Sequence, residues 1–207
     1  MGYYVKIHPD NPQMQKVEDA AKILDKGGLV IFPTDTIYAI GASTKSAKGL
    51  EALARFKGVK LEKSKFSFLF YDLSHLSEYT KNFDTSVYKL LKRNLPGPYT
   101  FIMEANNALS KAFKNKKKEV GIRVPDNNIP RELVKELGHP IAATSLHSDD
   151  EILEYPTDAE LIYKDYKHTV DAVIDGGAVG NIASTVVDLT SGEPELIRAG
   201  KGSFEEL

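Results

Sequence analysis

The stretch GGLVIFPTDTIYAIGA, residues 27–42, joins an apolar run directly to a polar one. Its residues 29–32 have the β-branched and aromatic composition of a short buried strand. Thr34, Asp35 and Thr36 follow that strand almost at once. Core packing gives no reason for a buried strand to end in two hydroxyls and a carboxylate, so these residues are candidates for binding. The alternative is that the hydroxyls serve only as turn or cap residues.

The composition is that of a folded protein, which we expect to form a single domain over residues 1–207. Hydrophobic residues make up 42% of the chain and the formal net charge is −2, so nucleic-acid binding would need a local basic patch. The lack of cysteine excludes disulfides, a thiolate zinc site and a cysteine nucleophile. The five histidines show no metal-ligand spacing. No apolar run approaches the roughly 20 residues of a membrane helix, and we expect a cytoplasmic protein without a membrane partner.

The hydrophobic periodicity predicts helices and strands that alternate along the chain. Neighbouring strands near 100–124 and near 184–199 indicate antiparallel pairs, so the predicted fold class is α/β, with a mixed sheet flanked by helices. Helices are predicted over residues 12–26, 46–56, 85–94 (capped by Asp84), 130–137 and after a capping box of Thr157 and Glu160; strands are predicted over 29–33, 66–71, 99–105, 119–124, 140–144, 171–175, 184–189 and 195–199.

Other polar residues stand where further predicted strands begin or end. Ligands of open α/β sheets bind outside strand ends, so these side chains are expected to converge. Hydroxyls and guanidinium groups without a Ser-His-Asp spacing favour recognition of anions and carboxylates over covalent catalysis. Arg123 and Arg198 lie in otherwise apolar strands, where each cation needs an anion from the protein or a ligand. The candidate residues are Thr34, Thr36, Arg123, Thr144, Ser145, His147, Ser184 and Arg198.

Lysines gather over residues 57–65 and 111–118. Such runs are usually solvated surfaces. They would also attract a phosphorylated substrate or an RNA backbone.

Six collinear segments resemble those of the YrdC/YciO family, and more closely those of its YciO branch. The family fold is a twisted mixed sheet flanked by helices, with a concave, positively charged groove. The segments that carry the resemblance are GGLVIFPTDTIYAIGA, LPGPYTFIM, VGIRVPDN, PIAATSLH, VIDGG and ASTVVDLT.

The resemblance implies synthesis of threonylcarbamoyl-AMP and pyrophosphate from L-threonine, bicarbonate and ATP, with Mg²⁺ accompanying ATP. This reaction is the first step toward threonylcarbamoyladenosine in tRNA. By matching positions, the resemblance implies that threonine is bound by Thr34, Thr36, Arg123 and Ser184, that the nucleotide is bound by Thr144, Ser145, His147 and Arg198, and that Lys57 is catalytic.

The chain departs from the synthases mainly on the ATP side. Their Lys-x-Arg signature appears here as Lys57-Gly58-Val59, and their Ser-x-Asn as Ser145-Leu146-His147. A histidine of the following synthase strand is replaced by an apolar residue within 66–71. Two alternatives to synthesis therefore stay open. One is hydrolysis of the adenylate, and the other is non-catalytic binding of double-stranded RNA, tRNA or ribosomal RNA.

Overall fold

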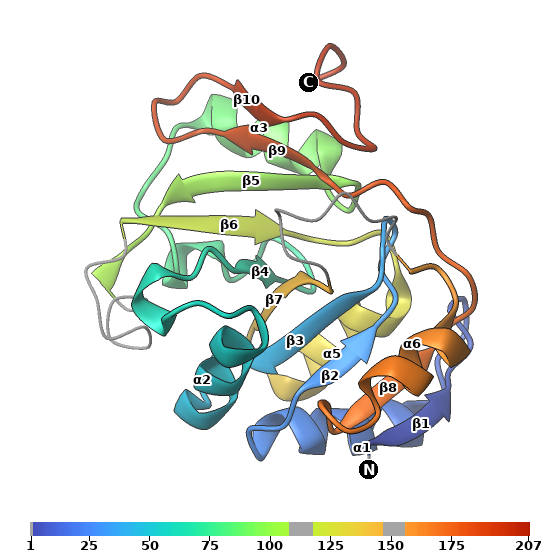
Figure 1. Ribbon diagram of the computed structural model, residues 1–207. Helices are drawn as coiled ribbons and strands as arrows, with labels where there is room; N and C mark the ends of the chain where they lie inside the picture. The colour runs from blue at the N-terminus through green and yellow to red at the C-terminus, as the bar shows by residue number, and fades with distance from the viewer. Residues whose placement is uncertain (1, 108–117, 147–155) are drawn as a thin grey trace.

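The computed structural model describes residues 2–107, 118–146 and 156–207 (Figure 1). In this part of the chain the strands form one ten-stranded sheet in the order β1-β8-β2-β3-β7-β4-β6-β5-β9-β10. The strands are β1 (Tyr3–Lys6), β2 (Val30–Phe32), β3 (Ala39–Ser43), β4 (Ser67–Leu69), β5 (Tyr99–Glu104), β6 (Glu119–Arg123), β7 (Ile141–Ser145), β8 (Ala172–Asp175), β9 (Thr185–Asp188) and β10 (Glu195–Arg198).

The helices cover the sheet through two apolar cores. Val17 and Leu133 share one core with Phe32, while Leu53 and Leu91 belong to the other. Figure 1 shows α3 beside the β5–β9–β10 end of the sheet and the other helices near the β1–β7 end. No helix in the described ranges is long and apolar enough to cross a membrane. The helices are α1 (Met14–Asp25), α2 (Ala47–Phe56), α3 (Thr85–Asn94), α5 (Asn128–Leu137) and α6 (Ala159–Tyr166), with short 3-10 turns η1 (Leu61–Lys63) and η2 (Leu76–Glu78).

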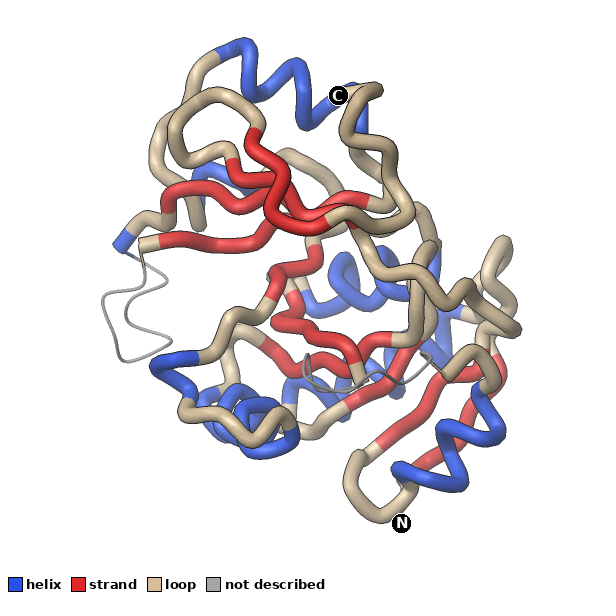
Figure 2. The backbone as a smooth tube through the Cα atoms, turned by 45° about the horizontal axis from the view of Figure 1, so that its top comes forward, coloured by secondary structure: helices blue, strands red, loops and turns tan. Residues whose placement is uncertain are grey.

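The sheet is mixed, as the sequence predicts. β5 pairs antiparallel with β6, and β9 pairs antiparallel with β10, which are the two antiparallel pairs expected from strand spacing. Parallel pairs join β4 to β6, β5 to β9 and β8 to both β1 and β2. Figure 2, in which strands are red, shows the sheet turning as it passes through the molecule.

Two strands lie outside the predicted set. β3 consists of the small residues AIGAS, which lack the bulky pattern of a strand. A Cβ at Gly41 would lie 2.6 Å from Ile141 Cγ2 and 2.8 Å from Phe32 Cε1, so this position admits only glycine without a shift. β1 pairs parallel with β8 and forms one edge of the sheet.

The predicted helix starts need correction at α1, α5 and α6, and the predicted cap needs correction at α3. α5 begins at Asn128 rather than at Pro130, with the side chain of Asn127 as its cap. α1 begins at Met14 rather than at residue 12, with Gln13 as its N-cap. Asp84 occupies the N-cap position of α3, but its side chain makes no capping hydrogen bond. The capping residue of α6 is Asp158, and not Thr157, because the Asp158 carboxylate accepts hydrogen bonds from the amides of the two residues that follow Ala159.

The alternation of side chains along the strands gives the two faces of the sheet near β5 and β6 different side chains. Phe101 and Ile122 are directly opposite one another and point into the core. Successive side chains alternate across a sheet, so the neighbouring positions Thr100 and Gly121 belong to the other face. These neighbours are small, so that face of the sheet is left open.

The cap of α6 gives a stability prediction. Asp158→Ala removes the acceptor of two helix amides and should lower the free energy of unfolding by about 1 kcal/mol. Thr157→Ala is the matched control and should have little effect, because within the described ranges only the backbone carbonyl of Thr157 takes part in a hydrogen bond. Urea denaturation of both variants measures the difference. If Thr157→Ala lowered the free energy of unfolding more than Asp158→Ala, Thr157 would be the capping residue, as the sequence predicts.

Candidate functional site

A cavity of about 620 Å³ opens on the concave face of the sheet. Its size is within the range of small-molecule sites, which is roughly 300–1,000 Å³. Strands β3 to β7 and β9 supply most of its wall, and β10 closes one side. The lining includes the polar residues Lys65, Ser67, Thr100, Lys118, Glu119, Arg123, Thr144, Ser145, Ser184 and Arg198.

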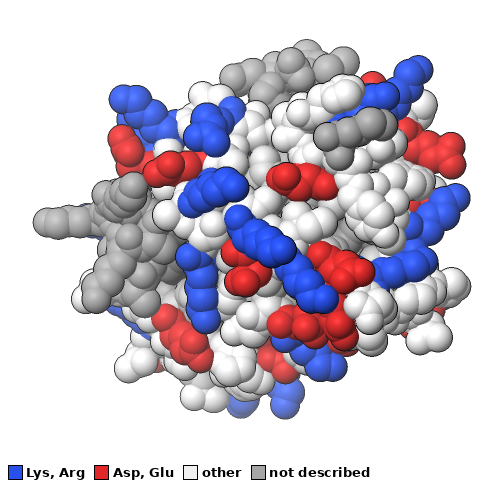
Figure 3. All heavy atoms as spheres, turned by 90° about the horizontal axis from the view of Figure 1, so that it is seen from below, with Lys and Arg blue, Asp and Glu red and all other residues white. Residues whose placement is uncertain are grey.

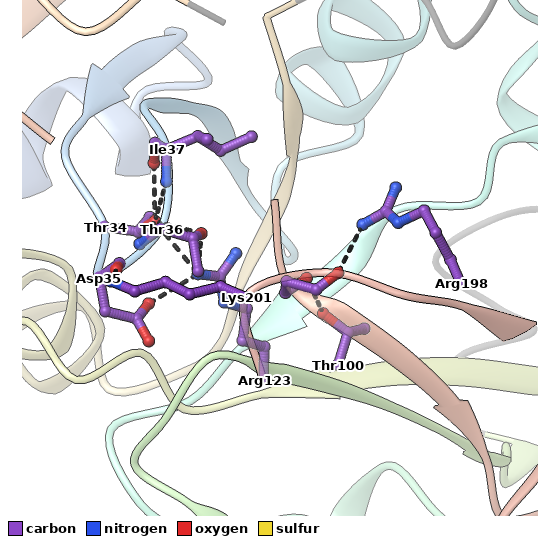
Figure 4. Close-up of polar contacts among 9 residues, drawn as sticks. Thr34, Asp35, Thr36, Ile37, Thr100, Arg123, Arg198 and Lys201 are labelled. Carbon is purple, nitrogen blue, oxygen red and sulfur yellow. Dashed lines mark hydrogen bonds and ion pairs between the residues drawn. The ribbon is translucent and has the colours of Figure 1, made fainter. Parts of the chain in front are cut away.

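Arg123 forms the most buried ionic contact at this cavity. It ends β6, and its side chain and that of Asp35 are each 8% exposed. The Arg123 Nη2 donates to Asp35 Oδ1 and Thr36 Oγ1, each at 2.6 Å, and to Thr34 Oγ1 at 3.1 Å (Figure 4). One nitrogen therefore joins the end of β6 to the loop that follows β2.

The loop after β2 is held by the hydroxyl of Thr34. This hydroxyl donates to the carbonyl of Ile37 at 2.6 Å and accepts from the amides of Thr36 and Ile37. Such bonds from a hydroxyl to nearby backbone are typical of turns. Thr34 and Thr36 are buried, and in the structure they hold the Arg123 guanidinium. Their contact with threonine stays a prediction.

Two buried polar atoms next to this contact have no hydrogen-bond partner among the described residues. They are Asp35 Oδ2, an acceptor, and Arg123 Nε, a donor. An unpaired buried polar group costs about 1–3 kcal/mol, and more when it is charged. Arg123 lines the cavity, so a ligand that brings an acceptor would meet the demand of its Nε. Asp35, Thr34 and Thr36 support Arg123 and do not themselves belong to the cavity lining.

Ser184 and Arg198 meet on another part of the cavity wall. The Ser184 hydroxyl lies 2.9 Å from the Thr100 hydroxyl, and the Ser184 carbonyl accepts from Arg198 Nη2 at 2.9 Å (Figure 4). Every residue of β10 is exposed, so the expectation of an apolar, buried environment for Arg198 is wrong. β10 is an edge strand, and the exposed Arg198 guanidinium donates to a backbone carbonyl.

The other predicted site residues are placed as follows. Thr144 and Ser145 end β7 and line the cavity. His147 lies outside the described residues. Lys57 is the C-cap residue that follows α2 and does not belong to the cavity lining, and Val59 beyond it is exposed. The catalytic role of Lys57 therefore stays a prediction of the family resemblance.

Sequence reasoning missed three residues that take part in the site. Thr100 is the polar residue within the apolar run YTFIM, which was a local signal. Lys65 belongs to a predicted lysine run, but nothing in the sequence separates it from its neighbours. Lys201 has no signal: its Nζ donates to the carbonyl of Asp35, which is 166 positions away. Within the described ranges, no group of three or more histidine or acidic residues is arranged to hold a metal ion.

The buried ion pair gives a second stability prediction. Asp35→Ala leaves a buried guanidinium without its counter-charge and should lower the free energy of unfolding by about 3–5 kcal/mol. The double variant Asp35→Ala/Arg123→Met removes both charges and should recover part of this loss.

The control is Glu104→Gln, which breaks the half-exposed pair with Lys81. We expect a change below about 1 kcal/mol for that variant in the same denaturation experiment. If Asp35→Ala were no more destabilising than Glu104→Gln, Asp35 and Arg123 would not form a buried pair.

Comparisons with known proteins agree over nearly the whole chain. The family model for Sua5, YciO and YrdC, described as Telomere recombination, matches residues 22–200. The chain is 38% identical over 204 residues to a Haemophilus influenzae protein, and 98% of each chain is covered. It is 36% identical over 207 residues to YciO of Escherichia coli, covering 99% of this chain and 98% of YciO. It is 28% identical over 193 residues to threonylcarbamoyl-AMP synthase of Pyrococcus abyssi, but it spans 56% of the length of that enzyme.

Solved structures show the same fold. The crystal structure of E. coli YciO matches with a TM-score of 0.88 and 35% identity, covering 98% of both chains. The structure of P. abyssi Sua5 complexed with L-threonine matches with a TM-score of 0.87 and 27% identity, covering 98% of this chain and 59% of Sua5. On the evidence of the family model, the YciO relatives and the shared fold, the chain belongs to the Sua5/YciO/YrdC family.

Proposed function

We propose that this protein binds L-threonine and ATP in the 620 Å³ cavity and forms threonylcarbamoyl-AMP for tRNA modification. The observation that carries the proposal is Arg123, which lines the cavity, is paired with the buried Asp35 and has an unmatched Nε donor. The carboxylate of an amino acid is a complementary acceptor. The family membership and the likeness to Sua5 complexed with L-threonine support the same ligand.

The proposal assigns the threonine to the part of the cavity near Arg123. Its carboxylate would accept from Arg123, and the carboxylate of Asp35 would balance the charge of the guanidinium. Ser184 lines another part of the same cavity, with its hydroxyl held by Thr100 at 2.9 Å, and would face the threonine from there. A hydroxyl that already has a fixed partner loses little freedom on binding, which favours recognition of the small polar side chain of threonine.

The nucleotide would then occupy the part of the cavity near Arg198, Lys65 and Lys118. Three cations can oppose the charge of a triphosphate. The magnesium ion is expected to arrive with ATP, bound mainly by the phosphate oxygens, as is usual for this ion. Thr144 and Ser145 also line the cavity and would contact the nucleoside.

The chemistry needs no protein nucleophile. The amine of threonine combines with bicarbonate to give a carbamate and water, and a carbamate oxygen attacks the α-phosphorus of ATP. The bond from this phosphorus to the bridging oxygen breaks, and pyrophosphate leaves. The contribution of the protein is to align the carbamate with the α-phosphate and to neutralise the developing charge. Both tasks suit a cavity lined by hydroxyl and cationic groups.

The reaction gives a direct test. Pyrophosphate release should require L-threonine, bicarbonate and Mg-ATP together. Arg198→Gln should lower kcat/KM by about tenfold or more, because one charge-assisted contact contributes roughly 1.5–3 kcal/mol. The matched control is Arg131→Gln, whose guanidinium also donates to a backbone carbonyl, that of Tyr71, but does not belong to the cavity lining. Equal losses in the two variants would place the nucleotide elsewhere.

RNA binding, the alternative from the sequence, predicts a different dependence on salt. Figure 3 shows one face of the molecule on which lysine and arginine side chains lie among aspartate and glutamate. Threonine and ATP affinities should change little between about 50 and 200 mM salt, whereas six phosphate contacts to RNA would cost roughly a thousandfold. Calorimetry measures the affinity for L-threonine, and fluorescence anisotropy measures the affinity for a labelled RNA duplex, each at both salt concentrations. Steeply salt-dependent RNA binding without threonine binding would replace the enzyme proposal.

A further inference from the structure

The segment 176–184 connects two distant strands of the sheet. It leaves β8, second in the strand order, and enters β9, ninth in that order (Figure 1). Seven strand spacings of about 4.8 Å would amount to about 34 Å in a flat sheet. A chain of ten residue steps reaches at most about 36 Å when fully extended. The sheet turns, so the actual span is shorter than this flat-sheet value, but nine residues still have to cross most of the sheet.

The start of this segment is fixed at Gly177, whose backbone amide and carbonyl are each held by a side chain. The amide of Gly177 donates to Asp175 Oδ1 at 2.9 Å. Its carbonyl accepts from the hydroxyl of Tyr38 at 2.7 Å. Gly177 has a φ of +90°, in the left-handed region that favours glycine. At Gly176 a Cβ would lie 2.6 Å from Pro33 Cγ, so the segment is also closely packed where it leaves β8.

The two side chains that hold Gly177 are themselves well fixed. Tyr38 is 1% exposed and immediately precedes β3. Burial raises the pKa of Tyr38, so its hydroxyl stays protonated and able to donate. Burial alone would raise the pKa of Asp175, but the Gly177 amide, the Tyr4 hydroxyl and the Lys6 ammonium hold it below its usual value. Tyr4 donates to Asp175 Oδ2 at 2.8 Å, which leaves Oδ1 directed at Gly177.

The far end of the segment forms part of the cavity wall. A Cβ at Gly180 would lie 3.0 Å from the carbonyl of Thr36, so the segment passes close to the loop that holds Arg123. Ala183 and Ser184 then line the cavity. The carbonyl of Ala183 accepts from the amide of Lys201, and the Lys201 side chain returns to the carbonyl of Asp35.

We propose that Tyr38 and Asp175 are positioning residues that clamp Gly177 and thereby hold segment 176–184 as the wall of the cavity next to Arg123. The clamp rests on the proposed function as far as its ligand, L-threonine, is concerned. Neither residue contacts the ligand. Each acts through the backbone of Gly177 on the placement of Ser184. Tyr38 lies in the segment 27–42 and Asp175 in the segment VIDGG, but neither is among the candidate binding residues of the sequence, and Tyr38 is not part of the cavity lining.

Tyr38→Phe tests the clamp, because it keeps the buried ring and removes only the hydroxyl. We expect faster hydrogen exchange in peptides covering residues 176–185, and an L-threonine Kd raised about fivefold to tenfold by calorimetry. The matched control is Tyr163→Phe, which also removes a hydroxyl bonded to a glycine carbonyl, that of Gly2, at 3.1 Å. It should leave both measurements at their wild-type values.

Variants of Asp175 give a second, independent test of the clamp. Asp175→Ala should loosen the same segment, whereas Asp175→Asn keeps an oxygen for the Gly177 amide and should recover most of the threonine affinity. A general loss of stability would instead lower the threonine affinity of both variants alike and would speed hydrogen exchange throughout the chain.

The outcomes separate the clamp from the proposed function. Unchanged exchange over 176–185 in Tyr38→Phe overturns the clamp, whether or not threonine binds. Faster exchange with an unchanged threonine Kd overturns its role at the cavity. A wild-type protein that does not bind L-threonine overturns the proposed function, and with it the positioning role, even where the exchange result shows that Gly177 is held.

Discussion

A buried guanidinium requires an anion, and the pairing of Arg123 with Asp35 brings together the parts of this molecule that form its cavity. The pair joins the end of β6 to the loop after β2, across the intervening strands β3, β7 and β4. Thr34 and Thr36 add two hydroxyl acceptors to the same nitrogen. The Thr34 hydroxyl also bonds the backbone of Ile37, so the side chain that meets Arg123 is the one that holds the loop. One side of the cavity is thus fixed before any ligand arrives.

The two faces of the sheet carry different kinds of side chain. The large side chains Phe101 and Ile122 fill the core on one face, and the small or polar residues between them leave the other face open. Segment 176–184 then crosses from β8 to β9 and supplies Ser184 to the open face. Fixed partners for Ser184 and Arg123 mean that the binding groups are pre-organised, which reduces the entropy lost on binding. This arrangement suits a reaction that depends on alignment and charge.

The sequence predicted much of the fold because most strands and helices carry strong local patterns. The prediction missed β3, because its small residues allow close packing against Phe32 and Ile141 but have low strand propensity. It located Thr34, Thr36 and Arg123 at strand ends, but not their mutual contact, because strand order is a long-range property. Asp35 was recognised as a member of the cluster and not as the partner of Arg123. The contact of Lys201 with Asp35 has no local signal of any kind.

The central claim is that the Arg123–Asp35 pair is part of the binding site and more than a structural contact. The Nε–H signal of Arg123 in ¹⁵N-labelled protein, assigned by its loss in Arg123→Lys, tests this most directly. The Nε is buried and has no acceptor among the described residues, so on saturation with L-threonine its proton resonance should move downfield as it gains one. The Nε–H signal of Arg131, which already donates to the Tyr71 carbonyl, serves as the reference and should not move. An Arg123 signal that stays in place at saturating L-threonine would contradict the account.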